Sequence, residues 1–266
     1  MNIIVLIKQV PDMEKVKFDR EKGVIDRKSA GTEINPFDLN ALEAAIQLKD
    51  KDDNVHVTAL SMGPPSAESA LKEAIARGAD EGILLSDRTF GGADTWATSL
   101  TLAAGIKNIG IYDLIIAGMQ TVDGDTGQVG PEIAELLDIP HISYVSEIEE
   151  VGSKFRGKVD IWDGTYLKEM ELPGLITVTK DINDPRLPSF KDKMKSRKAE
   201  IPVWSYETLE EYLNGEKIGI KGSPTVVKKI EVPKATTRKG KLWRENIDQA
   251  VDEMIEIFKE IKVLEG

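Results

Sequence analysis

The 266-residue sequence contains no cysteine and only two histidines. Disulfides, iron–sulfur clusters, cysteine metal sites and thiol nucleophiles are therefore excluded, and the lack of cysteine is consistent with a reducing cytoplasm. The histidines, His56 and His141, lie far apart in the chain, and each lies within an apolar run. We interpret both as hydrogen-bonded strand residues rather than as parts of a metal centre.

Basic residues and long apolar runs are also scarce. There are 35 lysines and arginines against 46 aspartates and glutamates, which gives a net charge of −11. Non-specific binding of nucleic acid needs a basic face, so the composition argues against a nucleic-acid partner. No apolar stretch reaches the roughly 18 residues of a membrane-spanning helix, and the apolar run at residues 3–7 is too short for a signal peptide. We expect a soluble, cytoplasmic protein that does not span a membrane.

The first half of the chain alternates short apolar runs with amphipathic segments. Apolar runs predict strands at residues 3–7, 55–60, 82–85, 114–117 and 141–145. Helices are predicted to begin near residues 35, 66, 94 and 128. Such alternation is typical of a parallel sheet with helices on both faces, which binds ligands beyond the carboxyl ends of its strands. The sequence therefore predicts an α/β fold, a parallel doubly wound Rossmann-like nucleotide-binding sheet.

The pattern changes after about residue 147. Residues 151–172 indicate an antiparallel excursion with turns at Gly152 and at Asp163-Gly164. The last part of the chain has few apolar residues of its own and ends in an amphipathic helix over residues 244–263. We expect an α/β domain over residues 1–190 and an extended C-terminal arm over residues 191–266 that packs on another surface.

Residues 113–131 form the most informative segment. An apolar run ends at Gly118, a loop rich in glycine, aspartate and threonine follows, and a helical pattern begins at Gln128 or Pro131. A strand, a glycine-rich turn and a helix N-terminus together direct backbone N–H groups at one point, which suits a phosphate. The loop has neither a Walker A lysine nor the Rossmann glycine spacing. From these residues alone, a plain strand-to-helix turn, with Asp123 and Asp125 as turn and N-cap residues, is an equally good interpretation.

Five motifs in order along the chain resemble the β subunit of electron-transfer flavoprotein. They are Ile7-Lys8-Gln9-Val10-Pro11-Asp12, Asn35-Pro36-Phe37-Asp38, Ser61-Met62-Gly63-Pro64, Ala76-Arg77-Gly78-Ala79-Asp80 and residues 118–130. The resemblance covers nearly the whole chain. It implies a heterodimer with an α subunit, over which the C-terminal arm of this chain extends, and a role in carrying electrons from flavin dehydrogenases to an acceptor.

The resemblance also implies an adenine-nucleotide site. The family's binding positions correspond here to Leu6, Asn35, Pro36, Phe37, Asp38, Met62, Gly118, Met119, Gln120, Thr121, Val122, Asp123, Gly124, Asp125, Thr126, Gly127, Gln128 and Val129. We expect the backbone around Leu6 and Met62 to contact the adenine edge, Asp38 to bind a ribose hydroxyl, and the loop to enclose the phosphate.

The phosphate loop differs from the mitochondrial-type pattern, which commonly has three consecutive acidic residues and a threonine in place of Val129. The run from Asp123 to Pro131 instead resembles the subgroup that performs flavin-based electron bifurcation. In that subgroup the β subunit binds a second FAD, which NADH reduces. Extra glycine is consistent with close approach of the backbone to a pyrophosphate. The resemblance therefore implies FAD, with AMP in a non-bifurcating electron carrier as the alternative.

The family's recognition segment, a leucine followed by a basic stretch, docks on partner dehydrogenases. It corresponds to Leu187, Pro188, Lys191 and Lys195, although this chain is a few residues shorter before Leu187. The implied partners are flavin dehydrogenases or iron–sulfur and quinone-reducing subunits, with quinone or ferredoxin as acceptor. The other interpretation makes Leu187 a core leucine or a plain surface leucine and the lysines a solvated helix face.

No side chain forms a plausible nucleophile or acid–base pair, so any redox chemistry would belong to the flavin. A free-standing nucleotide-binding module of the universal-stress type would share the sheet and the loop. It would not explain residues 148–266.

Overall fold

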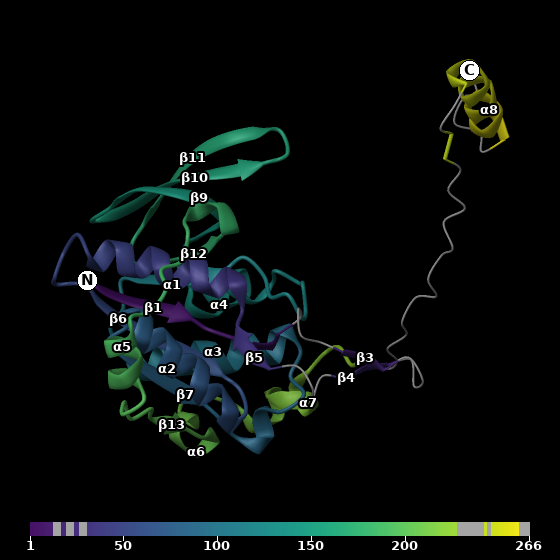
Figure 1. Ribbon diagram of the computed structural model, residues 1–266. Coiled ribbons are helices and arrows are strands. Elements are labelled where there is room, and N and C mark those ends of the chain that lie inside the picture. Colours follow the sequence, from purple (N-terminus) through teal and green to yellow (C-terminus); the bar gives the residue numbers. More distant parts are fainter. Residues whose placement is uncertain (13–16, 20–23, 27–30, 228–241, 244–245, 261–266) are drawn as a thin grey trace. The chain divides into compact units, whose positions relative to one another are not determined.

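The computed structural model describes residues 1–12, 17–19, 24–26, 31–227, 242–243 and 246–260 (Figure 1). Its contacts divide the chain into a first unit, Met1–Lys228, and a second unit, Lys229–Gly266. The first unit contains the sheet and the residues expected to bind a nucleotide. The second contains one described helix, α8 (Ile247–Glu260).

Apolar runs in the first unit form a nine-stranded sheet of order β11-β10-β9-β12-β8-β1-β6-β7-β13. Pairing is parallel from β9 through β13, and β10 and β11 extend the β9 edge with antiparallel pairing. The strands are β1 (Asn2–Leu6), β6 (His56–Met62), β7 (Glu81–Leu85), β8 (Leu114–Gly118), β9 (His141–Val151), β10 (Lys154–Ile161), β11 (Gly164–Glu171), β12 (Gly174–Val178) and β13 (Val203–Trp204). The predicted parallel α/β sheet and its antiparallel excursion are confirmed.

Two short antiparallel pairs lie between β1 and the first helix in the sequence. The outer pair is β2 (Gln9–Pro11) with β5 (Thr32–Ile34), and the inner pair is β3 (Lys17–Asp19) with β4 (Val24–Asp26). The polar residues at 16–26 predict a small hairpin, and the inner pair is its described part.

Helices alternate with most of the parallel strands of the first unit, as the sequence predicted. They are α1 (Pro36–Lys49), α2 (Glu68–Arg77), α3 (Thr95–Ile109), α4 (Val129–Leu137), α5 (Phe190–Ser196), α6 (Tyr206–Leu209) and α7 (Gly219–Gly222). Short 3-10 turns occur at Pro65–Ala67, Arg88–Phe90, Lys180–Ile182 and Gly215–Lys217. Among the described helices, none has the length and apolar character that crossing a bilayer demands.

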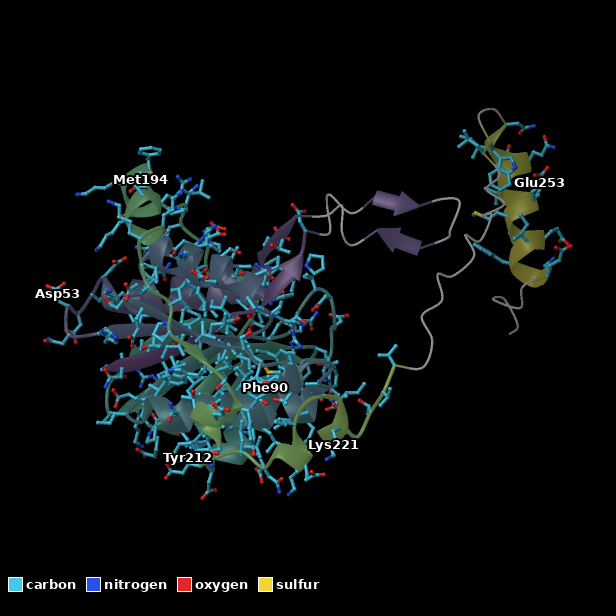
Figure 2. The ribbon with its side chains drawn as sticks, turned by 90° about the horizontal axis from the view of Figure 1, so that it is seen from below. Asp53, Phe90, Met194, Tyr212, Lys221 and Glu253 are labelled. Atoms are coloured by element: carbon cyan, nitrogen blue, oxygen red, sulfur yellow. The ribbon has the colours of Figure 1, made fainter. Side chains whose placement is uncertain are left out.

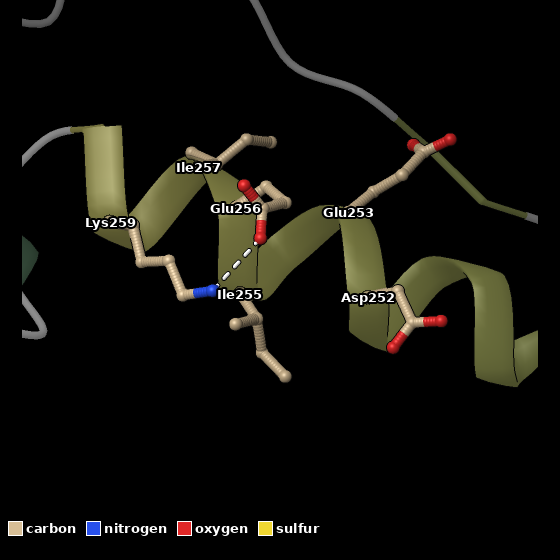
Figure 3. A pocket seen from close by; sticks show the side chains of 6 residues that line it. All are labelled: Asp252, Glu253, Ile255, Glu256, Ile257 and Lys259. Atoms are coloured by element: carbon tan, nitrogen blue, oxygen red, sulfur yellow. Dashed lines mark hydrogen bonds and ion pairs between the residues drawn. The ribbon is translucent and has the colours of Figure 1, made fainter.

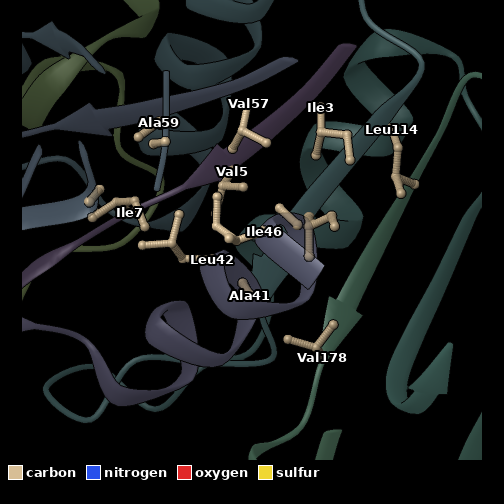
Figure 4. Packing of buried hydrophobic residues seen from close by; sticks show 14 of the residues in the cluster. Ile3, Val5, Ile7, Ala41, Leu42, Ile46, Val57, Ala59, Leu114 and Val178 are labelled. Atoms are coloured by element: carbon tan, nitrogen blue, oxygen red, sulfur yellow. The ribbon is translucent and has the colours of Figure 1, made fainter. Parts of the chain in front are cut away.

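The sheet separates two apolar cores because successive side chains of a strand point to opposite faces. On one face, Ile3 and Val5 of β1 pack with Leu42 and Ile46 of α1, as Figure 4 shows. The same cluster includes residues of α2. On the other face, Ile4 of β1 lies in a cluster with residues of α3, α4 and α6. Continuous burial of β1 on both faces is the expected property of a central parallel strand.

The first unit continues past the predicted boundary at residue 190. Helix α5 contacts α2, and Val203 of β13 pairs with Leu84 of β7. Leu209 and Ile218 are buried in the second core. These elements are too short to produce a periodic signal, so their residues looked like part of an arm. Packing of residues 229–266 on a partner stays a prediction.

Two other segments differ in length from their predictions. Strand β9 runs on to Val151 because it pairs with β10 beyond the parallel part of the sheet. The sequence at residues 206–213 predicts a short helix, whereas the structure has the shorter α6, with Leu213 buried after it. Helix α8 lies inside the predicted range 244–263, whose two ends fall outside the described residues.

Candidate functional site

The predicted nucleotide residues gather at one edge of the sheet. Strands β6, β1 and β8 are parallel neighbours, so their carboxyl ends meet there (Figure 1). Met62 ends β6, Gly118 ends β8, and Lys8 follows β1. The start of α1 joins them because the backbone N–H of Asn35 donates to the carbonyl oxygen of Lys8 at 2.9 Å.

Asn35 connects the start of α1 to the loop between β8 and α4. Its side chain is fully buried, and its amide Nδ2 donates to the carbonyl oxygen of Gln120 at 2.9 Å. Its Oδ1 accepts the backbone N–H of Val122 at 3.1 Å. Asn35 therefore positions the loop and leaves α1 without a side-chain cap.

Asp38 is buried at the centre of this junction. Its Oδ2 accepts the backbone N–H of Lys8 at 2.8 Å, and its Oδ1 accepts Nδ2 of Asn35 at 3.0 Å. The Gly118 backbone also hydrogen-bonds this carboxylate. We expected Asp38 to bind a ribose hydroxyl, but both oxygens accept from the chain itself. The geometry favours a structural role, in which Asp38 holds β1, α1 and β8 together.

Burial raises the pKa of Asp38 to about 7, against the opposing hydrogen bonds from Asn35 and Lys8. Between pH 3.8 and about 7 the folded chain thus keeps a proton that the unfolded chain releases. The contribution of Asp38 to the free energy of unfolding therefore falls as the pH rises through this interval, by as much as about 4 kcal/mol.

Asp38→Asn, which cannot titrate, should lack this pH dependence. Urea unfolding at pH 5 and pH 8 checks this: relative to the variant, the unsubstituted chain is expected to be less stable at pH 8 than at pH 5. The same stability difference at both pH values would contradict the expectation.

The loop before α4 folds on itself. The backbone N–H groups of Gly124 and Asp125 donate to the carbonyl oxygen of Thr121 at 3.3 and 2.8 Å, and Asp125 and Gly127 have positive φ values of 57° and 65°. The Gln120 side-chain amide binds the Asp125 carboxylate. Left-handed backbone at Gly127 explains the glycine there.

The N-cap of α4 is Gln128, and it makes no side-chain capping bond. The interpretation in which Asp123 or Asp125 caps this helix is therefore wrong, because both carboxylates bind other side chains. Within the described residues, the backbone N–H groups of Thr126, Gly127 and Gln128 have no hydrogen bond to a protein acceptor. Free N–H groups beside an uncapped helix N-terminus suit an anion.

Lys8 belongs to the first of the five sequence motifs, but the sequence alone predicts no role for its side chain. Its Nζ lies 2.7 Å from Oδ1 of Asp123 and 3.5 Å from Oγ1 of Thr121. Burial by itself raises the pKa of Asp123, but hydrogen bonds from Lys8 and Thr121 outweigh this and lower it overall. No local pattern pairs Lys8 with Asp123, since only the adjacency of β1 and β8 brings the two residues together.

Other predicted positions lie around this junction. Leu6 is buried in the core that includes residues of α3 and α4. Met62 is partly buried and packs against the same core. Phe37 is buried, and the Lys180 ammonium lies 4.6 Å from the centre of its ring. Beside Met62, the buried hydroxyl of Ser61 has no hydrogen-bond partner in the described structure. This edge thus has polar groups still to be satisfied.

The predicted docking segment is at the surface. Leu187 is 85% exposed, so it is not a core residue, and both a docking residue and a plain surface leucine fit this exposure. Phe190 and Met194 of α5 are also exposed, and Figure 2 shows Met194 on this helix. Pro188 is partly buried, whereas Lys191 and Lys195 are exposed. An apolar surface with basic neighbours results.

Arg186 fixes the start of this segment to α1. Its Nε lies 2.8 Å from Oε2 of Glu43, a residue only 6% exposed, and its Nη2 lies 2.6 Å from Oδ2 of Asp50. The guanidinium of Arg77 donates to the carbonyl oxygen of Arg186. The exposed residues that follow therefore begin from a fixed point on the first unit.

Comparison with known proteins identifies the family. Residues 22–209 match the electron transfer flavoprotein domain. The chain is 46% identical over 253 residues to the electron transfer flavoprotein subunit beta of Clostridium acetobutylicum. The aligned region covers 95% of this chain and 94% of that protein. The chain belongs to the electron transfer flavoprotein family, as a β subunit. Its role is electron transfer, in a family that associates generally with flavin or AMP.

Two further relatives carry the names of reductase subunits. The chain is 40% identical over 264 residues to the caffeyl-CoA reductase-Etf complex subunit CarD of Acetobacterium woodii, covering 99% of this chain and all of that protein. It is 42% identical over 238 residues to the acryloyl-CoA reductase electron transfer subunit gamma of Anaerotignum propionicum, covering 88% of this chain and 89% of that protein.

A hollow in the second unit belongs to α8 alone. Its lining residues are Asp252, Glu253, Ile255, Glu256, Ile257 and Lys259 (Figure 3). The Lys259 ammonium pairs with the Glu256 carboxylate at 2.9 Å. Because these side chains come from one helix and point outward around it, we assign no ligand to this hollow. Within the described residues, no group of three or more acidic, histidine or cysteine side chains could hold a metal ion.

Proposed function

We propose that this β subunit binds FAD at the carboxyl edge formed by β6, β1 and β8, and that it transfers electrons by flavin-based bifurcation. The bound flavin would supply the redox chemistry, with NADH as electron donor and the α-subunit flavin, a partner dehydrogenase and a quinone or ferredoxin as acceptors.

The observation that carries the proposal is the loop before α4. Its unpaired N–H groups at residues 126–128 and the uncapped start of α4 offer several donors to phosphate oxygens. Gly124 adds no side chain over this turn, and Gly127 adopts the left-handed conformation that the loop needs. The identity to the CarD subunit of a caffeyl-CoA reductase-Etf complex supports the link to a reductase.

The residues at this edge fit an adenine nucleotide. The loop amides and the Thr126 hydroxyl would bind the phosphates, and the backbone around Leu6 and Met62, with the unpartnered Ser61 hydroxyl, would meet the adenine. Asn35 and Asp38 would act indirectly by fixing the loop and the strand ends. These residues would bind and orient the flavin.

Cofactor analysis of the complex purified with its α subunit tests the proposal. The complex is denatured, and the released nucleotides are separated and counted against protein. Two FAD per heterodimer with no AMP is the expected result. One FAD and one AMP would instead make this chain a structural subunit of a non-bifurcating carrier. The α subunit purified alone is the control, because it reports its own flavin content.

The exposed segment after Arg186 and the second unit would provide the contacts with partners. Leu187 and Phe190, flanked by lysines, offer an apolar surface with positive charge to an acidic partner dehydrogenase. Helix α8 exposes Ile247 and Val251 and would pack on the α subunit. Apolar groups in these positions gain stability when a partner covers them.

A further inference from the structure

The loop proposed to receive a phosphate is itself acidic. Asp123 and Asp125 both lie in the turn that precedes α4. Asp125 is held by the side chain of Gln120, which is uncharged. An ionised carboxylate near a phosphate repels it, and this repulsion is strong where solvent is partly excluded. Some group must compensate the charge of Asp123 if the loop is to bind an anion.

Lys8 is placed to do this. Its ammonium makes the 2.7 Å ion pair with Asp123 and reaches the hydroxyl of Thr121, whose carbonyl oxygen closes the turn. The side chains of Lys8 and Asp123 are 44% and 30% exposed, so both remain accessible to a ligand at the sheet edge. Lys8 thus contacts the first residue of the turn and the aspartate within it.

The backbone of Lys8 is fixed on both sides. Its N–H donates to the buried carboxylate of Asp38, and its carbonyl oxygen accepts the N–H of Asn35. Asn35 in turn binds Gln120 and Val122 of the loop. The ammonium is therefore held against the loop by the same network that positions the loop.

We propose that Lys8 is the residue that makes this acidic loop receptive to the phosphates of an adenine nucleotide, because it neutralises Asp123 and holds the carboxylate against the turn. The inference rests on the proposed nucleotide site and deepens it. Lys8 is a positioning residue here, and its effect is exerted through Asp123 rather than by contact with the phosphate.

Charge substitutions distinguish an effect of Lys8 through Asp123 from direct contact of Lys8 with the phosphate. The full chain, freed of bound nucleotide, is titrated calorimetrically at low salt with adenosine diphosphate, which carries the pyrophosphate shared with FAD, and with uncharged adenosine. Lys8→Met is expected to weaken diphosphate binding about tenfold and to leave adenosine binding unchanged. Asp123→Asn is expected to tighten diphosphate binding, and the double variant to return close to the unsubstituted chain.

The control is Lys154→Met. It removes a different ion-paired lysine, which lies on β10 and pairs with two glutamates, and it should change the affinity for neither adenosine diphosphate nor adenosine. Thermal unfolding shows that each variant is folded. Added salt should shrink the effect of Lys8→Met, because it screens exposed charges.

Three results would overturn the inference. If the double variant binds the diphosphate as weakly as Lys8→Met, the lysine contacts the phosphate directly. If adenosine binding falls in parallel, Lys8 only supports the fold. If Lys8→Met binds like the unsubstituted chain, the lysine has no role although the nucleotide site stands. Failure of the unsubstituted chain to bind either ligand would instead remove the proposed site and this inference together.

Discussion

Gly118→Ala is expected to destabilise the first unit by about 3 kcal/mol and to abolish nucleotide binding. A methyl group at this position would lie 2.7 Å from Cβ and 2.8 Å from the carbonyl carbon of Phe37, and closer still to Oδ1 of Asp38. The backbone at the start of α1 cannot give way as the tip of a flexible side chain could. The added carbon would therefore separate β8 from α1 and break the junction at Asp38.

The matched control is Gly124→Ala in the same loop. A Cβ there meets only Oγ1 of Thr121, at 3.3 Å, and the residue does not have positive φ. We expect stability close to that of the unsubstituted chain, so this variant separates the steric effect at Gly118 from the mere replacement of a glycine. Urea unfolding and nucleotide released on denaturation measure both variants. Normal stability and full nucleotide content for Gly118→Ala would show that the junction tolerates separation.

The contrast between these glycines shows what the sequence could and could not predict at the site. A glycine-rich loop between a strand and a helix is a local pattern, so the loop itself was predictable. Which glycine is irreplaceable depends on α1, whose first turn packs against Gly118 from far away in the sequence. The ion pair of Lys8 with Asp123 could not be predicted for the same reason, since the two residues are 115 positions apart in the sequence.

The fold could be predicted from the sequence more completely than the site, for a physical reason. A strand buried on both faces is largely apolar, so β1 and β8 appear in the sequence as nearly continuous apolar runs. Strand β13 has only two residues and belongs to the sheet because it pairs with β7. Such a strand has no pattern of its own, which is why the predicted boundary at residue 190 falls too early.

Arg186→Met is expected to lower the free energy of unfolding by about 2 kcal/mol at neutral pH, since it leaves the buried carboxylate of Glu43 without its charged partner. The partial exposure of Arg186 places this figure below that for a fully buried pair. Burial raises the pKa of Glu43, but the hydrogen bonds from Arg186 outweigh burial and lower it from its usual 4.5. The contribution of the pair is thus present above pH 4.5 and is lost as the pH falls through the lowered value.

Urea unfolding at pH 7 and at acid pH tests this expectation, with Arg88→Met, which removes an exposed arginine, as the control. The difference between Arg186→Met and the unsubstituted chain should shrink on acidification, whereas the control should stay near zero at both pH values. An undiminished difference at acid pH would assign the effect to lost packing of the arginine chain instead of to the ion pair.

Loss of Arg186 should also impair docking, because this residue fixes the start of the exposed segment to α1. Electron transfer to a partner dehydrogenase is expected to slow, while assembly with the α subunit stays normal. Leu187→Ala separates the two effects: the side chain is 85% exposed, so its removal should leave stability unchanged and slow electron transfer alone. Normal transfer rates for Leu187→Ala would mean that the partner binds elsewhere on the chain, and that Arg186 serves stability only.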